Sequence, residues 1–144
     1  MKILVINGVN MNMLGTREPE KYGMLTLKEL EKELYAYSFE LGIDIETFQS
    51  NHEGEIVEKI QQAKNNADGI VINAAAYTHT SVAIRDAISS VSIPAVEVHM
   101  TNIHAREEFR QKSLIAGVCI GQISGFGIHS YKLALKGLSD ILKK

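Results

Sequence analysis

Polar side chains able to bind a ligand and exchange protons occur in four clusters, each of which directly follows a short apolar or alternating run. The clusters combine amides and hydroxyls with histidines and an arginine. Such a set supplies neutral hydrogen-bond donors and acceptors together with a cation, which suits a small polyhydroxylated molecule that carries a carboxylate. The clusters are Asn7, Asn10, Asn12, Arg17 and Tyr22; Ser50, Asn51, His52 and Glu53; Asn73, Tyr77, His79 and Ser81; and His99, Thr101, Asn102 and His104.

Four apolar runs, and one run at residues 43–49 that alternates between apolar and polar residues, predict the strands that position these clusters. The first run lacks polar alternation, as expected for a strand that is buried on both faces. Amphipathic segments separate the runs, and strands that alternate with helices favour a parallel sheet with helices on both faces. We therefore predict the α/β class, as a flavodoxin-like three-layer sandwich. Its five-stranded parallel sheet has the order 2-1-3-4-5, with strands near residues 3–6, 43–49, 70–72, 93–99 and 118–123.

The segments between these runs predict five helices. One begins at Thr26, because Thr26-Leu27-Lys28-Glu29 has the form of a capping box, and it ends at Gly42. The others lie near residues 56–63, 82–88, 105–113 and 128–142. Ligands of open α/β sheets bind beyond the carboxyl ends of the strands, so we expect the polar clusters to converge at one edge of the sheet.

Residues 8–25 fit neither the helical nor the strand period, and they contain glycine, proline and asparagine. A segment of this length without regular structure in a compact domain is typically a lid or a binding loop. We predict a single catalytic domain over residues 1–144, with an active-site lid at about residues 9–25.

Composition excludes several classes of protein. The chain has 144 residues, 45% hydrophobic and 22% charged, which is enough for one domain with a sizeable core. A net charge of −2 offers no basic excess for nucleic acid. The single cysteine, Cys119, excludes an intrachain disulfide and argues against a cysteine zinc site. Neither a signal peptide nor a membrane-spanning run is present, so we expect a cytoplasmic protein without a membrane partner.

The familiar nucleotide and metal motifs are absent from the sequence. It contains no P-loop, no dinucleotide fingerprint and no H-E-x-x-H spacing. Structural roles also remain open: Asn10 and Asn12 in turns, Tyr22 in packing, His79 as a helix cap, and His99 as a histidine with satisfied bonds. Arg106 and Arg110 fit a solvated helix face, and Cys119 fits a core strand. The residues alone therefore leave open an enzyme for a small polar substrate, a non-catalytic flavodoxin-like module that binds a small polyol or nucleotide, and a flavoprotein.

Four segments, in order along the whole chain, resemble the signature motifs of the type II 3-dehydroquinate dehydratases. The first runs from Asn7 to Pro19 and continues into Tyr22-Gly23. The others cover residues 49–55, residues 76–83 with 85–87, and residues 97–99 with 102–107. The chain departs from the family pattern at Val9 and Ala74, where proline is usual, and at Met100-Thr101, which replaces a more usual Ile/Leu-Ser pair.

This resemblance implies the trans-elimination of water from 3-dehydroquinate through an enolate, which yields 3-dehydroshikimate in the shikimate pathway to aromatic amino acids. It implies Tyr22 as the base, with Arg17 favouring the phenolate, because a free tyrosine has a pKa of about 10. It also implies that Asn12 orients a water or the enolate oxygen, and that His99 is the general acid, oriented by Glu97. No cofactor and no metal are expected, and no lysine Schiff base is needed if hydrogen bonds hold the enolate.

The resemblance further implies substrate-binding residues and an assembly. The family assembles as a homo-oligomer, a dodecamer that is a tetramer of trimers, in which the residue matching Asp86 reaches a neighbouring site. The residues expected to bind 3-dehydroquinate are Asn73, His79, Asp86, Met100, Thr101 and Arg110.

Overall fold

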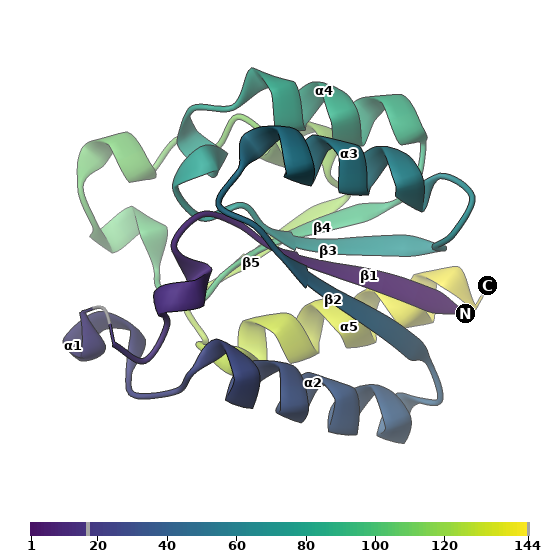
Figure 1. Ribbon diagram of the computed structural model, residues 1–144, viewed down its shortest axis with the longest axis horizontal. Helices are drawn as coiled ribbons and strands as arrows, with labels where there is room; N and C mark the ends of the chain where they lie inside the picture. The colour runs from purple at the N-terminus through teal and green to yellow at the C-terminus, as the bar shows by residue number, and fades with distance from the viewer. Residues whose placement is uncertain (17, 144) are drawn as a thin grey trace.

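Five parallel strands form one sheet in the order β2-β1-β3-β4-β5, as predicted (Figure 1). The structure, a computed structural model, describes the backbone of residues 1–16 and 18–143, and the side chains in these ranges except those of Lys21 and Tyr22. The strands are β1 (Lys2–Asn7), β2 (Asp44–Gln49), β3 (Gly69–Asn73), β4 (Ala95–His99) and β5 (Gly121–Ser124).

Helices cover both faces of this sheet, which explains why nearly every residue of β1, β3 and β4 is buried. In Figure 1, α2 (Leu27–Leu41) and α5 (Ile128–Leu142) cover one face, and α3 (Glu53–Ala63) and α4 (Val82–Val91) cover the other. Alternate residues of a strand point to opposite faces. In β1, Ile3 and Val5 accordingly belong to the core beside α2 and α5, whereas Leu4 and Ile6 belong to the core beside α3 and α4.

The predicted ends of α2 are confirmed. The Thr26 hydroxyl accepts a hydrogen bond from the backbone N–H of Glu29 at 3.2 Å, and the Glu29 carboxylate accepts one from the Thr26 N–H in return. Gly42 ends the helix with φ 70°, a left-handed conformation that glycine adopts without steric cost. Local chemistry therefore determines where this helix begins and ends.

Three segments differ from the predictions. Residues 8–25 are not one irregular loop, because they contain the 3₁₀ turn η1 (Met11–Met13) and the short helix α1 (Pro19–Tyr22). Residues 105–113 do not form an α-helix but lie around two 3₁₀ turns, η3 (Ile103–Ala105) and η4 (Glu108–Arg110). An extended residue, Arg106, with φ −106° and ψ −166°, separates these turns and interrupts any helical hydrogen bonding.

The third difference concerns the last strand. The strand predicted at residues 118–123 begins only at Gly121, because η5 (Ala116–Val118) occupies the preceding residues. Cys119 therefore lies before the strand and is half-buried, so its assignment to a core strand was wrong.

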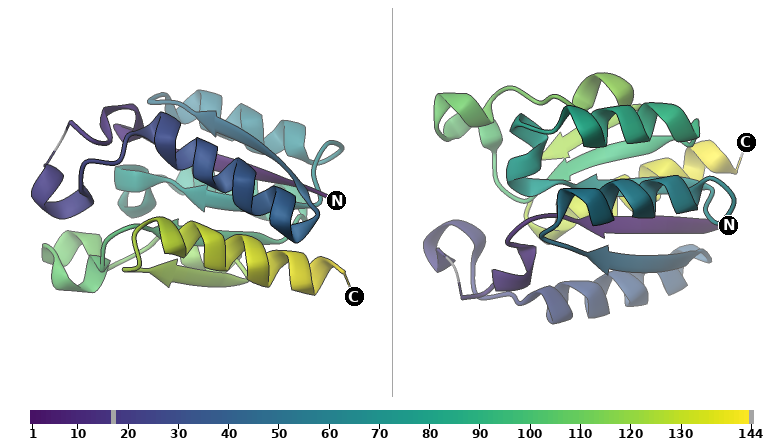
Figure 2. Two further views of the ribbon diagram at one scale, coloured as in Figure 1. Left: turned by 90° about the horizontal axis from the view of Figure 1, so that it is seen from below. Right: turned by 45° about the horizontal axis from the view of Figure 1, so that its top comes forward.

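The carboxyl ends of the strands meet the irregular segments at one end of the molecule. The two views of Figure 2 agree with Figure 1 that η1, α1 and the turns after β4 lie on this side, while both chain termini lie at the opposite end. Within the described ranges, no helix is both long and apolar enough to cross a membrane.

Candidate active site

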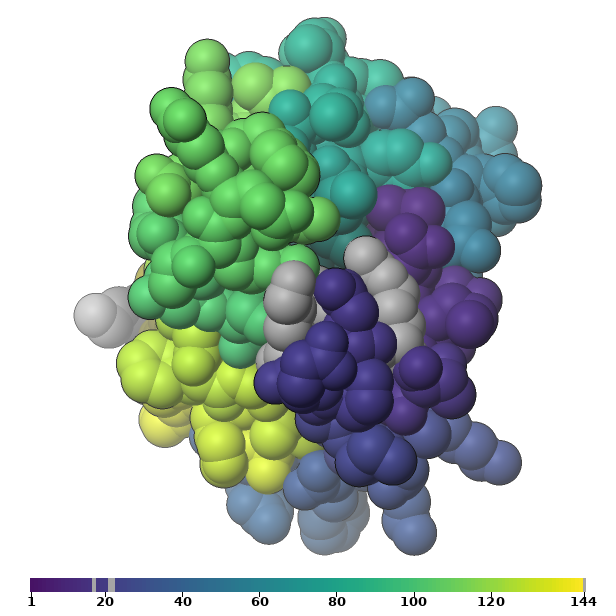
Figure 3. Space-filling model, turned by 90° about the vertical axis from the view of Figure 1, so that its left-hand side faces the viewer, coloured from purple at the N-terminus to yellow at the C-terminus, as the bar shows by residue number. Residues whose placement is uncertain are grey.

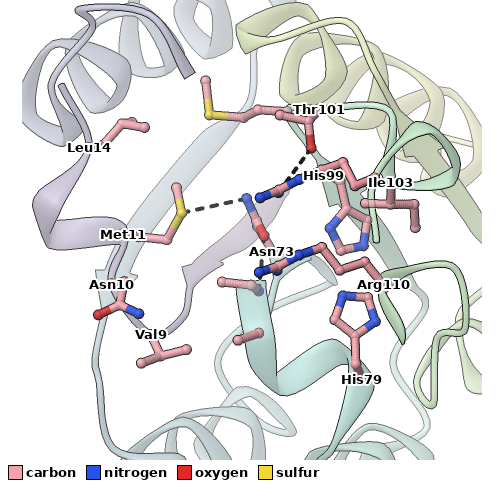
Figure 4. A pocket seen from close by; sticks show the side chains of 14 residues that line it. Val9, Asn10, Met11, Leu14, Asn73, His79, His99, Thr101, Ile103 and Arg110 are labelled. Carbon is pink, nitrogen blue, oxygen red and sulfur yellow. Dashed lines mark hydrogen bonds between the residues drawn. The ribbon is translucent and has the colours of Figure 1, made fainter. Parts of the chain in front are cut away.

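A pocket lies at the carboxyl edge of the sheet, where the predicted clusters were expected to converge. Figure 3 faces this end of the molecule, with the segment around α1 beside the turns that follow β4. Figure 4 shows side chains from the segment after β1 and from the ends of β3 and β4 around the cavity. The residues that line it are Val9, Asn10, Met11, Leu14, Asn73, Ala75, Ala76, His79, His99, Met100, Thr101, Ile103, Arg106 and Arg110.

A buried histidine–carboxylate pair forms the base of this site. His99 ends β4, and Glu97 lies two residues earlier, so both side chains project from the same face of the strand. Glu97 is 0% exposed and His99 is 5% exposed. The His99 Nε2 atom forms a hydrogen bond with the Glu97 Oε2 atom.

Distant segments supply the other partners of Glu97. The hydroxyl of Ser113 donates to Oε1 at 2.7 Å, and the side-chain amide of Gln122 donates to Oε2 at 2.8 Å. Burial raises the pKa of the Glu97 carboxyl, but the hydrogen bonds from His99, Gln122 and Ser113 together outweigh this effect and hold its pKa below the usual value. Glu97 is therefore a carboxylate at neutral pH.

These bonds also determine which nitrogen of His99 carries a proton towards Glu97. The Ser113 oxygen already accepts the backbone N–H groups of Ile115 and Ala116, so its own proton points to the carboxylate. An amide nitrogen such as that of Gln122 can only donate. An ionised Glu97 has no proton to donate, so it accepts the hydrogen bond from His99 as well, and the His99 Nε2 atom must carry the hydrogen. Nδ1 is then the ring nitrogen left to exchange a proton with a bound molecule.

Two further polar side chains are oriented by backbone groups. The Nδ1 atom of His79 lies 2.8 Å from the carbonyl oxygen of Lys112, which can only accept, so this nitrogen carries a hydrogen. The His79 and His99 rings lie 6.4 Å apart between centroids. The cap of α4 is Ser81, whose hydroxyl accepts the Ile84 N–H at 2.9 Å, so the interpretation of His79 as that cap was wrong.

Arg106 and Arg110 line the pocket, so the interpretation of both as a solvated face was wrong. Their side chains are only 12% and 18% exposed. Arg106 donates to the hydroxyl of Thr101 at 3.5 Å, and the Nε atom of Arg110 lies 3.0 Å from a carboxylate oxygen of Glu107. Two guanidinium groups at one pocket favour an anionic ligand. Sequence reasoning did not select Arg106, although its position soon after a strand ending in His99 was an available signal.

The cluster after β2 supports the pocket from outside and does not line it. The Asn51 side-chain oxygen accepts the backbone N–H of Asn10 at 2.9 Å, and the Tyr77 hydroxyl donates to the Asn51 carbonyl at 2.7 Å. Gly8 brings the first loop against β3, where a Cβ atom at this position would lie 2.5 Å from the Ala74 carbonyl oxygen. These contacts hold the start of the first loop beside the pocket.

Several predicted site residues lie elsewhere. Asn12 is exposed on η1, and Asp86 is exposed on α4; neither lines the pocket, whereas Met100 and Thr101 do. Arg17 lies outside the described residues, as does the side chain of Tyr22, whose backbone ends α1. Across residues 1–16 and 18–143, no three His, Cys, Asp or Glu side chains gather closely enough to hold a metal ion.

The fold and the pocket together define a class: an open α/β protein with a buried histidine–carboxylate pair and two arginines at the carboxyl edge of its sheet. The chain belongs to the type II dehydroquinase family, because the family model described as "Dehydroquinase class II" matches residues 1–139. The prediction from the sequence motifs is thereby confirmed.

Individual relatives agree with this assignment over their full lengths. The chain is 58% identical over 144 residues to the 3-dehydroquinate dehydratase of Geotalea daltonii, covering 100% of both chains. It is 57% identical over 141 residues to that of Endomicrobium trichonymphae, covering 98% of this chain and 99% of the relative. The crystal structure of type II dehydroquinase from Butyrivibrio crossotus DSM 2876 superposes with a TM-score of 0.95 at 51% identity, covering 96% of this chain and 97% of the other.

Proposed function

We propose that this chain is a hydro-lyase that removes water from 3-dehydroquinate to give 3-dehydroshikimate. The single observation that carries the proposal is the buried Glu97–His99 pair in a pocket that also holds two arginines. The names of its relatives specify the same reaction. The pocket matches the substrate, which carries a carboxylate for the guanidinium groups and hydroxyls for the amide and histidine side chains.

The reaction requires loss of a proton α to a ketone and departure of a hydroxyl group. We assign the first step to Tyr22 as the base, with the Arg17 cation favouring its phenolate. Removal of the proton leaves an enolate, for which hydrogen bonds substitute for a Schiff base. Asn12 is assigned to the water or enolate oxygen in this step. Asn12 is exposed on η1, in the same segment of about residues 9–25 that contains Arg17 and Tyr22.

The second step uses the histidine. The enolate collapses to the enone as the C–O bond breaks, and His99 donates a proton through Nδ1 so that the hydroxyl leaves as water. Glu97 accepts the Nε2–H, which keeps the ring in this tautomer and stabilises its protonated form. The substrate thus loses one water, Tyr22 gains a proton and His99 loses one, and the return of a proton from Tyr22 to His99 by way of solvent restores both groups.

Substrate binding is assigned to the remaining polar groups of the pocket. Asn73, His79, Met100, Thr101 and Arg110 all line it, and they supply amide, imidazole, hydroxyl and guanidinium donors. We assign Asp86 to the site of a neighbouring subunit, consistent with its exposed position on α4 outside its own pocket. We also propose a dodecamer built as a tetramer of trimers, a cytoplasmic location, and a role in the shikimate pathway to aromatic amino acids.

The segment of about residues 9–25 is assigned as a lid of this single catalytic domain. It carries Arg17 and Tyr22, and its start lines the pocket through Val9, Asn10 and Met11. A lid brings catalytic groups to the substrate after binding and excludes water from the reaction.

An absorbance assay tests the proposed function. Purified protein is mixed with 3-dehydroquinate, and the ultraviolet absorbance of the conjugated enone is followed with and without borohydride. Growth of absorbance that borohydride does not abolish supports a dehydratase that forms no Schiff base. Inactivation by borohydride would contradict the site assignment. Binding without turnover by the folded protein would favour the non-catalytic binding module instead.

A further inference from the structure

Three buried polar side chains from distant parts of the chain meet beneath the pocket. Asn7 and Asn73 are register partners at the ends of β1 and β3, and Tyr131 lies on α5, which packs against this face of the sheet. Asn7 and Tyr131 are 0% exposed, and Asn73 is 4% exposed. Of these three residues only Asn73 lines the pocket, so Asn7 and Tyr131 act on a bound ligand through Asn73.

The hydrogen bonds among these residues can run in one direction only. The backbone N–H of Ala75 donates to the Asn73 Oδ1 atom at 3.1 Å, which places the Asn73 nitrogen towards Tyr131. This nitrogen donates to the Tyr131 hydroxyl at 2.9 Å, and the hydroxyl donates to the Asn7 Oδ1 atom at 2.5 Å. A reversed Asn73 amide would set its NH₂ group against the Ala75 N–H, donor against donor.

This arrangement leaves one buried donor unsatisfied. The Asn7 Nδ2 atom has no hydrogen-bond partner in the described part of the chain. An unsatisfied buried donor costs about 1–3 kcal/mol of stability, which a leucine at this position would not incur. A costly polar group beside a ligand pocket is expected where it serves the site.

The second hydrogen on the Asn73 nitrogen points towards a weak acceptor. The Asn73 Nδ2 atom lies 3.8 Å from the Met11 thioether sulfur, and Figure 4 shows this contact within the pocket. A thioether accepts hydrogen bonds poorly, so an oxygen of a bound carboxylate or hydroxyl replaces it readily. The pocket therefore presents an N–H donor of Asn73 at this point. A reversed Asn73 amide would present its carbonyl oxygen instead, which would repel an anionic oxygen of the ligand.

We propose that Tyr131 is a positioning residue that holds the Asn73 amide with its N–H towards the substrate, and that Asn7 holds the Tyr131 hydroxyl in the required direction. For the identity of the substrate, this inference rests on the proposed function. Burial raises the pKa of the Tyr131 phenol well above its ordinary value, although the bond from Asn73 lowers it, so the hydroxyl keeps the proton that it donates to Asn7.

The test is the Tyr131→Phe variant, which removes only the hydroxyl. We expect the KM for 3-dehydroquinate to rise about tenfold, as for loss of one well-placed hydrogen bond to a charged group, with kcat changed by less than about threefold. The control is Ser139→Ala, which removes another buried hydroxyl from α5, one that donates to the Lys136 carbonyl at 2.9 Å. This control should lower Tm without changing KM.

A double-variant cycle separates positioning from general destabilisation. In an Asn73→Ala background, Tyr131→Phe should raise KM no further, because the side chain through which Tyr131 acts is gone. If Tyr131→Phe raises KM by the same factor in the wild-type and Asn73→Ala backgrounds, the proposal is overturned. An unchanged KM in folded Tyr131→Phe would also overturn it. If Tyr131→Phe does not fold, Asn7→Ala tests the same point: KM should rise in the wild-type background and not in the Asn73→Ala background.

Wild-type turnover is measured first, so that failure of this inference and failure of the proposed function remain distinct. Absence of turnover counts against the proposed function alone, and calorimetric Kd values for 3-dehydroquinate then replace KM in the same cycle. Equal Kd values for the wild type and Tyr131→Phe would overturn the inference.

Discussion

Replacement of Glu97 by glutamine tests the direction of each hydrogen bond that the carboxylate accepts and the catalytic role proposed for the Glu97–His99 pair. The carboxylate accepts from Ser113 at one oxygen and from His99 and Gln122 at the other. A glutamine has one oxygen and one NH₂ group, so it cannot accept at both positions. If its oxygen faces His99, its NH₂ group faces the Ser113 hydroxyl, whose oxygen already accepts two backbone N–H groups.

The other orientation directs the NH₂ group at His99. The His99 ring must then accept at Nε2, which moves its hydrogen to Nδ1. In both orientations the neutral glutamine lacks the negative charge of Glu97 that stabilises the protonated ring. Either orientation leaves a buried donor poorly paired, at a cost of about 1–3 kcal/mol in stability. Because positioned proton transfer contributes about 10²–10⁴ in rate, we expect kcat of Glu97→Gln to fall by at least about 100-fold.

The assay is steady-state kinetics with 3-dehydroquinate, together with thermal unfolding of each variant. The control is Glu46→Gln, which removes the charge of a carboxylate that pairs with Lys2 and Lys59 and does not line the pocket. This control should keep kcat. A kcat for Glu97→Gln within about threefold of wild type would refute the assigned tautomer and the role of Glu97.

Stability against pH gives a second readout of the same variant. The pKa of Glu97 is lowered in the folded protein, because hydrogen bonds to the carboxylate outweigh its desolvation. Its ionisation therefore adds stability above the ordinary pKa of about 4.3, which is lost as the pH falls through the lower folded value. The variant has no such group, so the gap in Tm between wild type and Glu97→Gln should narrow below about pH 4.3. A gap that stays constant with pH would contradict the lowered pKa.

Three further predictions concern Arg17 and Tyr22 in the proposed lid, Arg106 in the pocket, and the start of α2. Arg17→Ala and Tyr22→Phe should each lower kcat far more than they weaken substrate binding, and an unchanged kcat would remove that residue from the mechanism. Arg106→Ala should raise the KM for 3-dehydroquinate about tenfold, through loss of a charge-assisted contact; steady-state kinetics with a normal KM would show that the substrate anion binds elsewhere. Thr26→Ala should lower the free energy of unfolding by about 1 kcal/mol, because the capping box is lost; urea unfolding measures this, and a fall in kcat would argue against a purely structural cap.

Much of the fold followed from local patterns. Apolar runs predicted β1, β3 and β4, since strands covered by helices on both faces need no polar alternation, and alternating residues predicted β2. The predicted bounds of α5, residues 128–142, match the structure, because its apolar face repeats with the helical period. The charged segment at 105–113 was wrongly predicted, since spacing alone does not reveal that Arg106 is extended between two 3₁₀ turns.

The sequence likewise predicted some residues of the candidate site and missed others. The rule that ligands bind beyond the carboxyl ends of parallel strands was enough to bring Asn73, His79 and His99 to one pocket. It did not select Arg106, and it did not separate the cluster after β2, which supports the first loop, from those that line the cavity. A charged side chain on a short turn is solvated or buried according to what packs over it, which is a property of distant segments.

The sequence by itself determined the order of elements, the edge at which the polar groups gather, and the family motifs. Only the tertiary structure decided the direction of the hydrogen bonds. Ser113 and Gln122, 16 and 25 residues from Glu97, make that carboxylate an acceptor on both oxygens. Tyr131, 124 residues from Asn7, orients the amide of Asn73. The physical reason is that local sequence encodes backbone preference and the period of burial. Whether a buried side chain donates or accepts a given hydrogen bond depends on the donors and acceptors that the folded chain places around it.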